Sequence, residues 1–231
     1  MKAPVICIDG PAASGKTTVA KLLADRLGYF YLDTGVLYRS VTWVALQREI
    51  PPRDGESLGQ LATQLLIEVK PAPKGDLRQT IVLADGEDVS LAIRSPRVDA
   101  HVSEVSAHQS VRTALIGVQR AIAEKGGVIL AGRDAGTVVW PEAEVKVYLT
   151  ASEEERARRR VDQAAEQGTQ LEYAAVLADL RRRDLYDSTR TVAPLRAASD
   201  AITLDTTPLS IEQVVDELLR ILHEKTGVSI P

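Results

Sequence analysis

The stretch CIDGPAASGKTT, residues 7–18, contains Gly10, then four residues, and then Gly15, Lys16 and Thr17. This spacing is the pattern of a glycine-rich phosphate-binding loop. The pattern has physical meaning only when a buried strand precedes it and a helix follows it. The flanking sequence therefore decides whether the match is functional or an ordinary tight turn.

Both flanks of the loop have the required character. The apolar, β-branched run at 4–9 predicts a buried parallel strand that stops at Gly10. After the loop, four apolar residues fall on one helical face, and Gly28 can end that helix. These four are Val19, Leu22, Leu23 and Leu27. A strand, a loop and a helix in this order favour a nucleotide-binding loop.

The chemistry of such a loop explains its residue types. Its glycines let consecutive backbone N–H groups converge on an anion at the helix N-terminus. Lys16 would place a positive charge on the outer phosphates, and the Thr17 hydroxyl is a candidate magnesium ligand. The predicted nucleotide-binding residues are Gly10, Pro11, Ala12, Ala13, Ser14, Gly15, Lys16, Thr17 and Thr18.

The rest of the chain alternates between predicted strands and helices, which indicates a parallel α/β sheet. Further strands are expected at 29–35, 128–132, 145–150 and 201–205. Helices are expected at about 36–48, at about 95–125 with Ser95 as cap, and around 180–190. Two more helices are expected to begin at capping boxes, Ser152 with Glu155 and Ser210 with Gln213.

The segment 51–96 differs from its surroundings. It contains Pro71 and Pro73, and then Asp85-Gly86 between two β-rich runs, which is a hairpin signal. The segment predicts a small antiparallel insert within the α/β chain.

Composition excludes several classes of function. The net charge of −4 and an aromatic content of 4% argue against nucleic-acid binding. No apolar run approaches the length of a membrane span, and the N-terminus is not typical of a signal peptide. A single cysteine, Cys7, lies in an apolar run, so we expect a buried thiol and a reducing, cytoplasmic environment.

Arginines recur along the chain, and they suit phosphate chemistry. They are Arg39, Arg112, Arg133, the groups at 156–160 and 181–183, and Arg190. Solvated helix faces explain the two groups equally well, but Arg133 follows the strand 128–132, at the end where α/β sheets bind ligands. Two nucleotides brought together repel, and guanidinium groups with magnesium counter that repulsion. No base-recognition motif of a guanine-nucleotide switch is present, and the three histidines, His101, His108 and His223, are interpreted as structural.

Five stretches together resemble the bacterial-type cytidylate kinase family of nucleoside monophosphate kinases. They are IDGPAASGKTT, YLDTGVLYRSV, LAGRDAGTVVWPEAEVKVYLTASEEERARRR, RRRDLYDSTRTVAPL and LDTTPLSIEQVV, in order from residue 5 to about 215. The insert at about 60–96 is similar to the extra segment of this bacterial type. Small departures are Ala12-Ala13-Ser14, Lys16-Thr17-Thr18, and Thr34 where serine is common.

The resemblance implies a P-loop kinase fold with a five-stranded parallel sheet flanked by helices, an acceptor-binding domain with the antiparallel insert, and a helical lid. The expected core is 1–34, 113–150 and 191–231; the acceptor-binding domain is 35–112; the lid with its flanking helices is 151–190. The implied reaction transfers a phosphoryl group from ATP, with magnesium, to CMP or dCMP. The implied partners are these nucleotides, and a cytoplasmic monomer is expected.

The resemblance also implies roles for individual residues. Arg39 and Arg133 would hold the acceptor phosphate, and Thr34 and Tyr38 would line its pocket. Ser103, Arg112 and Asp134 would recognise cytosine, while Arg183 and Asp187 would contact the sugar. The implied catalytic residues are Lys16, Arg133, Arg158 and Arg190, with Arg159 as the alternative to Arg158 in the lid. Kinases for UMP, AMP or shikimate, and a binding module without transfer activity, are the competing hypotheses.

Overall fold

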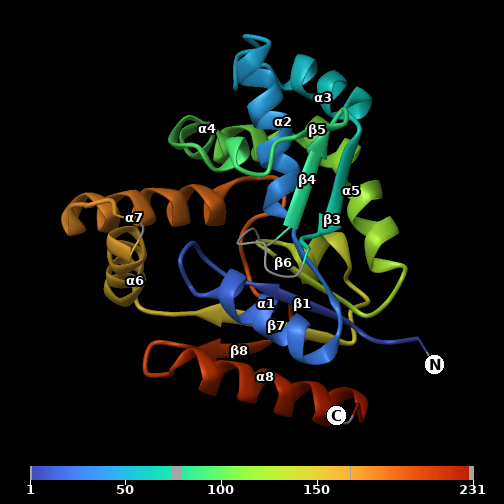
Figure 1. Cartoon of the computed structure of the whole chain (residues 1–231), viewed down its shortest axis with the longest axis vertical. Helices are drawn as coiled ribbons and strands as arrows, with labels where there is room; N and C mark the ends of the chain where they lie inside the picture. The colour runs from blue at the N-terminus through green and yellow to red at the C-terminus, as the bar shows by residue number, and fades with distance from the viewer. Residues whose placement is uncertain (1, 74–79, 167, 229–231) are drawn as a thin grey trace.

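The computed structural model describes residues 2–73, 80–166 and 168–228. Its centre is a five-stranded parallel sheet with the strand order β2-β6-β1-β7-β8 (Figure 1). The strands are β1 (Val5–Asp9), β2 (Phe30–Asp33), β6 (Val128–Gly132), β7 (Val145–Thr150) and β8 (Ile202–Asp205). The predicted fold class and all five predicted core strands are confirmed.

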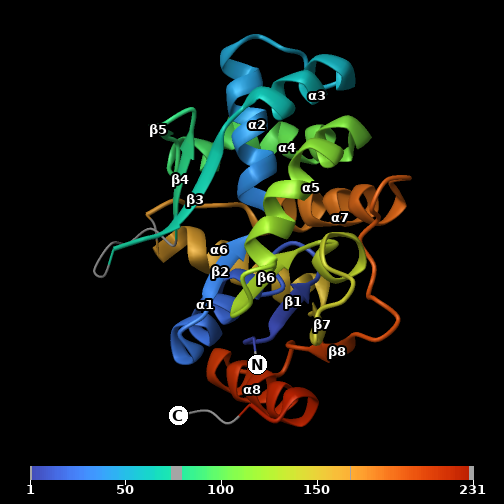
Figure 2. The same cartoon turned by 90° about the vertical axis from the view of Figure 1, so that its right-hand side faces the viewer.

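Helices cover both faces of this sheet because successive side chains of a strand point to opposite sides. Ile6 and Ile8 pack with α1 (Lys16–Leu27) and α8 (Ile211–Thr226). Val5 and Cys7 pack in the cluster on the other face, with α2 (Gly35–Gln47) and α5 (Gln109–Ala123). Figures 1 and 2 both place α8 on the side of the sheet opposite to α2 and α5.

Cys7 is fully buried in this second cluster, as predicted. Burial raises the pKa of its thiol well above the ordinary value, and the nearby Asp9 carboxylate adds to the effect. The thiol is therefore a packing group and not a nucleophile.

The predicted antiparallel insert is a second sheet with the order β3-β4-β5. Its strands are β3 (Ile67–Pro71), β4 (Thr80–Ala84) and β5 (Glu87–Asp88). Asp85 and Gly86 have φ angles of 49° and 85° and join β4 to β5 as a two-residue hairpin. The hairpin signal in the sequence is thus confirmed. One helix of this region, α3 (Gly55–Gln64), was not predicted.

The long helix expected from Ser95 to about Lys125 is wrong. Two helices are present, α4 (Pro96–Ala107) and α5, and His108 between them is extended, with ψ of 123°. Its Nε2 lies 2.8 Å from the carbonyl oxygen of Pro52, which ties the break to the segment before α3. The short η1 turn (Ala92–Arg94) precedes α4, and the Ser95 side chain makes no capping hydrogen bond.

Two helices that contact each other, α6 (Glu153–Glu166) and α7 (Tyr173–Thr189), stand beside the core (Figure 1). Ser152 caps α6 by accepting from the N–H of Glu155, at 3.2 Å. The second hydrogen bond of the predicted capping box, from the Ser152 N–H to the Glu155 side chain, is wrong. The Glu155 carboxylate accepts from two arginines instead, and the Ser152 N–H donates to Thr207. At α8, Ser210 and Gln213 form the complete box.

Within the described ranges, no helix combines the length and the apolar character needed to cross a lipid bilayer.

Candidate active site

The loop between β1 and α1 has the backbone shape of an anion-binding turn. Gly10, Ala13 and Gly15 have φ angles of 153°, 58° and 90°. Such changes of backbone handedness let neighbouring N–H groups converge. At Gly10 the loop passes directly against β7, since a Cβ there would lie 2.1 Å from the carbonyl oxygen of Leu149. Glycine is required at this position by both conformation and space.

Lys16 folds back over this loop from the first position of α1. Its Nζ donates to the carbonyl oxygen of Pro11 at 2.5 Å and to Ser14 Oγ at 3.2 Å. Burial lowers the pKa of Lys16 well below its usual value, and the charge of Arg133 lowers it further. An anion in the loop would offset both effects. Thr17 and Thr18 follow on α1, half-buried and exposed respectively.

Asp9 joins the turn after β6 to the loop. It was not among the site residues predicted from the sequence. Asp9, the last residue of β1, accepts hydrogen bonds of 2.8 Å from the N–H groups of Ala135 and Gly136. These residues begin the π-helical turn η2 (Ala135–Val139). Burial raises the pKa of Asp9 to about 6, although the two N–H groups act in the opposite direction. Asp9 therefore fixes the Arg133-Asp134 turn beside the phosphate-binding loop.

Two of the residues predicted to recognise the base, Arg112 and Asp134, meet in the structure beside Tyr38, which was predicted to line the phosphate pocket. Asp134 forms a buried ion pair with Arg112, whose guanidinium carbon lies 5.1 Å from the centroid of the Tyr38 ring. Arg112 also donates to the carbonyl oxygen of Ser106. Ser103 lies on the same helix, α4, one turn before Ser106. The cluster thus offers a carboxylate, a guanidinium and an aromatic face in one place.

Asp187, on α7, lies between two of the predicted phosphate-binding arginines. Arg133 Nε donates to it at 2.9 Å, and Arg190 Nη1 lies 3.9 Å from its other oxygen. Arg133 Nη1 also donates to the carbonyl oxygen of Gly10, at 3.2 Å. The Arg133 guanidinium therefore links the phosphate-binding loop directly to Asp187 of α7. Burial lowers the pKa of Arg190, and Arg112 contributes.

The remaining predicted acceptor residues lie nearby. Thr34 is buried and donates to the carbonyl oxygen of Ala131; Gly132 leaves room for it, since a Cβ there would lie 2.4 Å from Thr34 Oγ1. Arg39, on α2, pairs with Asp99 at 2.6 Å. Burial lowers the pKa of Arg183, and the charges of Arg133 and Arg39 add to this effect.

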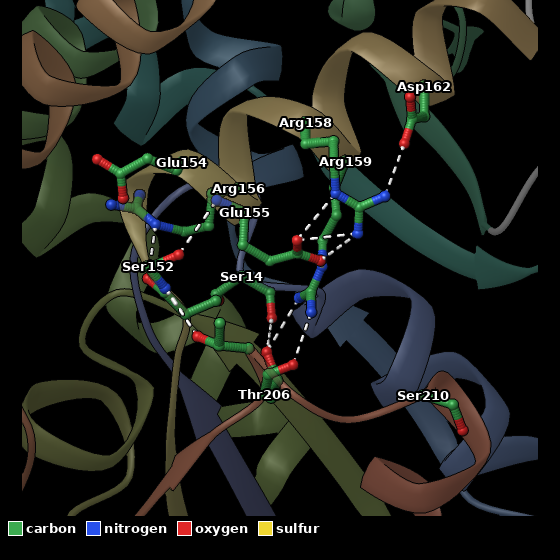
Figure 3. Close-up of polar contacts among 12 residues, drawn as sticks. Ser14, Ser152, Glu154, Glu155, Arg156, Arg158, Arg159, Asp162, Thr206 and Ser210 are labelled. Carbon is green, nitrogen blue, oxygen red and sulfur yellow. Dashed lines mark hydrogen bonds and ion pairs between the residues drawn. The ribbon is translucent and has the colours of Figure 1, made fainter.

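The arginines of α6 differ in direction (Figure 3). Arg156 is buried, donates to the carbonyl oxygen of Ala12 and pairs with Asp184. Arg159 donates to the side chain and the carbonyl oxygen of Thr206, at 3.0 and 2.6 Å. The Thr206 hydroxyl lies 3.5 Å from the carbonyl oxygen of Ser14. Two arginines of this run therefore contact the loop or its immediate support.

Arg158 is not brought to the loop. Its side chain is 62% exposed and pairs with Glu155 and Asp162 on the outer face of α6 (Figure 3). The catalytic role assigned to Arg158 stays a prediction, as do the roles of the other predicted site residues.

Sequence reasoning missed four polar residues of this site. They are Asp9, Asp99, Asp184 and Thr206. For Asp9 the sequence contains one indication, because it is a single acid at the end of an apolar strand, directly before the loop. The other three gave none, because polar residues on helices and at strand ends are ordinary surface features.

The sheet order, the glycine loop after β1 and the arginines around it define the class of P-loop kinases. A solved structure of an uncharacterized protein from Eubacterium ventriosum is 11% identical, with a TM-score of 0.52, over 96% of this chain and 99% of that one. At this identity the similarity concerns the fold alone.

Sequence comparison gives the family. The profile of the family described as Cytidylate kinase matches residues 6–224. A cytidylate kinase of Geobacillus sp. (strain WCH70) is 48% identical over 222 residues, or 96% of this chain and 97% of the relative. A bifunctional pantoate ligase/cytidylate kinase of Gloeobacter violaceus is 47% identical over 228 residues, which are 98% of this chain and 44% of that protein. The chain belongs to the cytidylate kinase family.

Proposed function

We propose that this protein transfers the γ-phosphoryl group of ATP to CMP and dCMP, giving ADP and CDP or dCDP. The observation that carries the proposal is the position of Arg133. One guanidinium contacts Gly10 of the glycine loop and Asp187, which would lie in the acceptor pocket. Because phosphoryl transfer depends on bringing two anions together, a fixed cation at the junction of two nucleotide sites is the central requirement.

On the donor side, the loop residues 10–18 would hold the ATP phosphates. The backbone supplies the N–H groups, and Lys16 supplies a charge that is already desolvated and held over the loop. The donors available here fit magnesium, which takes oxygen ligands and binds largely through substrate phosphates. Thr17 would provide the hydroxyl ligand, and the bound ion would neutralise charge on the outer phosphates.

On the acceptor side, Asp134 would accept a hydrogen bond from the exocyclic amine of cytosine, which uracil lacks. Ser103 and Arg112 would complete the base site, and the Tyr38 ring would line it. Leaving either the amine or the buried carboxylate unpaired costs about 1–3 kcal/mol, enough to discriminate between the two bases. The buried Arg112–Asp134 pair supports this role, because it would hold the carboxylate in place for the contact.

The acceptor phosphate and sugar would lie among the remaining predicted residues. Arg39, Arg133 and Arg190 would bind the phosphate, with Thr34 at the pocket wall. Arg183 and Asp187 would contact the sugar. A planar guanidinium group can donate two parallel hydrogen bonds to two oxygens of one phosphate. These arginines would therefore orient the acceptor oxygen and also reduce its repulsion from ATP.

Helices α6 and α7 would act as the lid over the donor phosphates. In the lid we assign Arg156 and Arg159 as the arginines nearest the loop, and Arg158 as a residue that would need to turn inward. The domain boundaries stay those predicted from the sequence: a core of 1–34, 113–150 and 191–231, an acceptor domain of 35–112, and a lid region of 151–190. A cytoplasmic monomer also stays a prediction.

A panel of acceptors tests the function. ADP release from ATP is measured with CMP, dCMP, UMP, AMP and shikimate, with and without magnesium. A preference for CMP and dCMP is expected. Equal rates on other acceptors would assign the chain to another small-molecule kinase. Nucleotide binding without turnover on any acceptor would indicate a regulatory binding module.

A further inference from the structure

One carboxylate near the acceptor site has no place in the proposed reaction. Five predicted acceptor-site arginines lie in this region, and three acids pair with them: Asp99, Asp134 and Asp187. Asp134 is assigned to the base and Asp187 to the sugar. Asp99 is therefore a negative charge placed at a site that must attract a dianion.

Both terminal nitrogens of the Arg39 guanidinium have partners in the protein, Asp99 and a backbone carbonyl oxygen. Asp99 Oδ1 lies 2.6 Å from Arg39 Nη2, while Nη1 donates to the carbonyl oxygen of Ile93 at 3.0 Å. Asp99 lies in the first turn of α4, and its side chain is 30% exposed, against 19% for Arg39. The ion pair is thus partly shielded from water, but it is exposed enough for an incoming anion to replace Asp99.

The neighbouring Arg183 shows that the cations here are not fully balanced by protein groups. Its Nε is buried without a hydrogen-bond partner among the described residues. Asp99 raises the pKa of Arg183, against the lowering by burial, Arg133 and Arg39. Arg39, Arg133 and Asp99 therefore all lie close enough to influence Arg183, and Asp99 is a counter-charge to both Arg39 and Arg183.

We propose that Asp99 is the resting partner of Arg39 and that the phosphate of the acceptor replaces it, so that Asp99 sets the affinity of this subsite for phosphate. A phosphate monoester can take both N–H groups of a guanidinium with a larger charge than a carboxylate carries. Because every anion must displace Asp99, this residue weakens the binding of free phosphate and of CMP by the same factor. CMP would still bind through its base and sugar contacts, whereas a free anion, which lacks them, would occupy the site less. This inference rests on the role of Arg39 in the proposed function.

The alternative is that Asp99 only orients Arg39. The two roles predict opposite changes in the affinity for anions when Asp99 is removed. Removal of a competitor strengthens anion binding, whereas removal of an orienting group leaves Arg39 less well placed and weakens it.

The test compares the full-length protein with Asp99→Asn, using inorganic phosphate as the probe. Its dissociation constant is measured calorimetrically and as competitive inhibition against CMP. Asp99→Asn is expected to lower this constant by about three- to fivefold, the size of one partly exposed ion pair. The KM for CMP should fall in parallel, while the KM for ATP stays unchanged.

Two further variants make the result specific. Asp216→Asn removes the Arg26–Asp216 pair of α1 and α8, outside the acceptor site, and should leave phosphate binding unchanged. In an Arg39→Met background, most of the effect of Asp99→Asn on phosphate binding should be lost, because the Arg39–Asp99 pair is already absent. Phosphate binding by Asp99→Asn that is unchanged or weaker would overturn the inference.

The two proposals fail separately. Absence of CMP phosphorylation by the unmodified protein overturns the proposed function, whatever the variant does. Normal CMP phosphorylation without tighter phosphate binding in Asp99→Asn overturns only the role of Asp99.

Discussion

The phosphate-binding loop is shaped by the backbone of a few consecutive residues, whereas the predicted acceptor pocket joins charged side chains from the turn after β6 and from α2, α4, α5 and α7. In the loop, positive φ angles and a close approach to β7 set the geometry. In the pocket, ion pairs between residues far apart in the chain set it, such as Arg133 with Asp187. The loop should therefore be broken by changes of shape, and the pocket by changes of charge.

Lys16 is the exception in the loop, because its contribution is a charge. Lys16→Met is expected to lower kcat by about 10³-fold, the usual loss when one charge that stabilises the transition state is removed. Because the ammonium is buried, the free energy of unfolding should not fall. Steady-state ADP release and chemical denaturation give the two quantities. Lys125→Met, at an exposed lysine after α5, is the control.

Gly10→Ala tests the loop by shape alone. The added methyl group would meet the Leu149 carbonyl oxygen, and φ of 153° is unfavourable for alanine. The free energy of unfolding should fall by about 3 kcal/mol. Gly117→Ala, within α5 where no atom lies within 4 Å of the new Cβ, should be neutral or slightly stabilising. Equal stability of the two variants would contradict the close contact at β7.

Asp9 joins the two regions and gives a dependence on pH. Its pKa is about 6 in the folded protein, against an ordinary value of 3.8, so the folded state binds the proton more tightly. Stability from this group is therefore greatest below pH 4 and declines as the pH rises to 6. The decline is about 2–3 kcal/mol, at 1.36 kcal/mol for each pKa unit.

Urea denaturation of the unmodified protein and Asp9→Asn at pH 4, 5, 6 and 7 isolates this contribution, since all other acids are shared. The difference in unfolding free energy should move in favour of Asp9→Asn as the pH rises. A constant difference across this range would contradict the raised pKa.

Asp134→Asn tests the pocket by charge, with the shape retained. The ratio of kcat/KM for CMP to that for UMP should fall roughly tenfold, which corresponds to about 1.4 kcal/mol. Initial rates with the two acceptors provide the ratio. An equal loss on both acceptors would show that Asp134 supports the pocket without recognising the base.

The same contrast explains what the sequence can predict. The five core strands and the Asp85-Gly86 hairpin are local patterns, and the structure confirms them. The break at His108 was not predicted because it depends on a contact with Pro52, which is distant in the sequence. Helix α3 was missed because Gly55 and Gly59 weaken its propensity, and packing on α5 decides its formation.

The site shows the same limit. The loop residues are contiguous, so one motif selects them all. Asp99 and Asp184 act through arginines from other elements, and an acid on a helix carries no sign of its partner. Similarly, the sequence of the run 156–160 does not show that Arg156 is buried while Arg158 is exposed. Which face of a helix is buried depends on the elements that pack against it.

The buried Cys7 has a practical consequence for observing this protein at work. It is the only cysteine of the chain, and its thiol is shielded and protonated, so maleimide reagents should leave it unmodified. Cysteines introduced at two exposed positions, D162C on α6 and Q64C on α3, would then carry a fluorophore pair without background labelling. The distance between α6 and α3 could be followed in solution as each nucleotide is added.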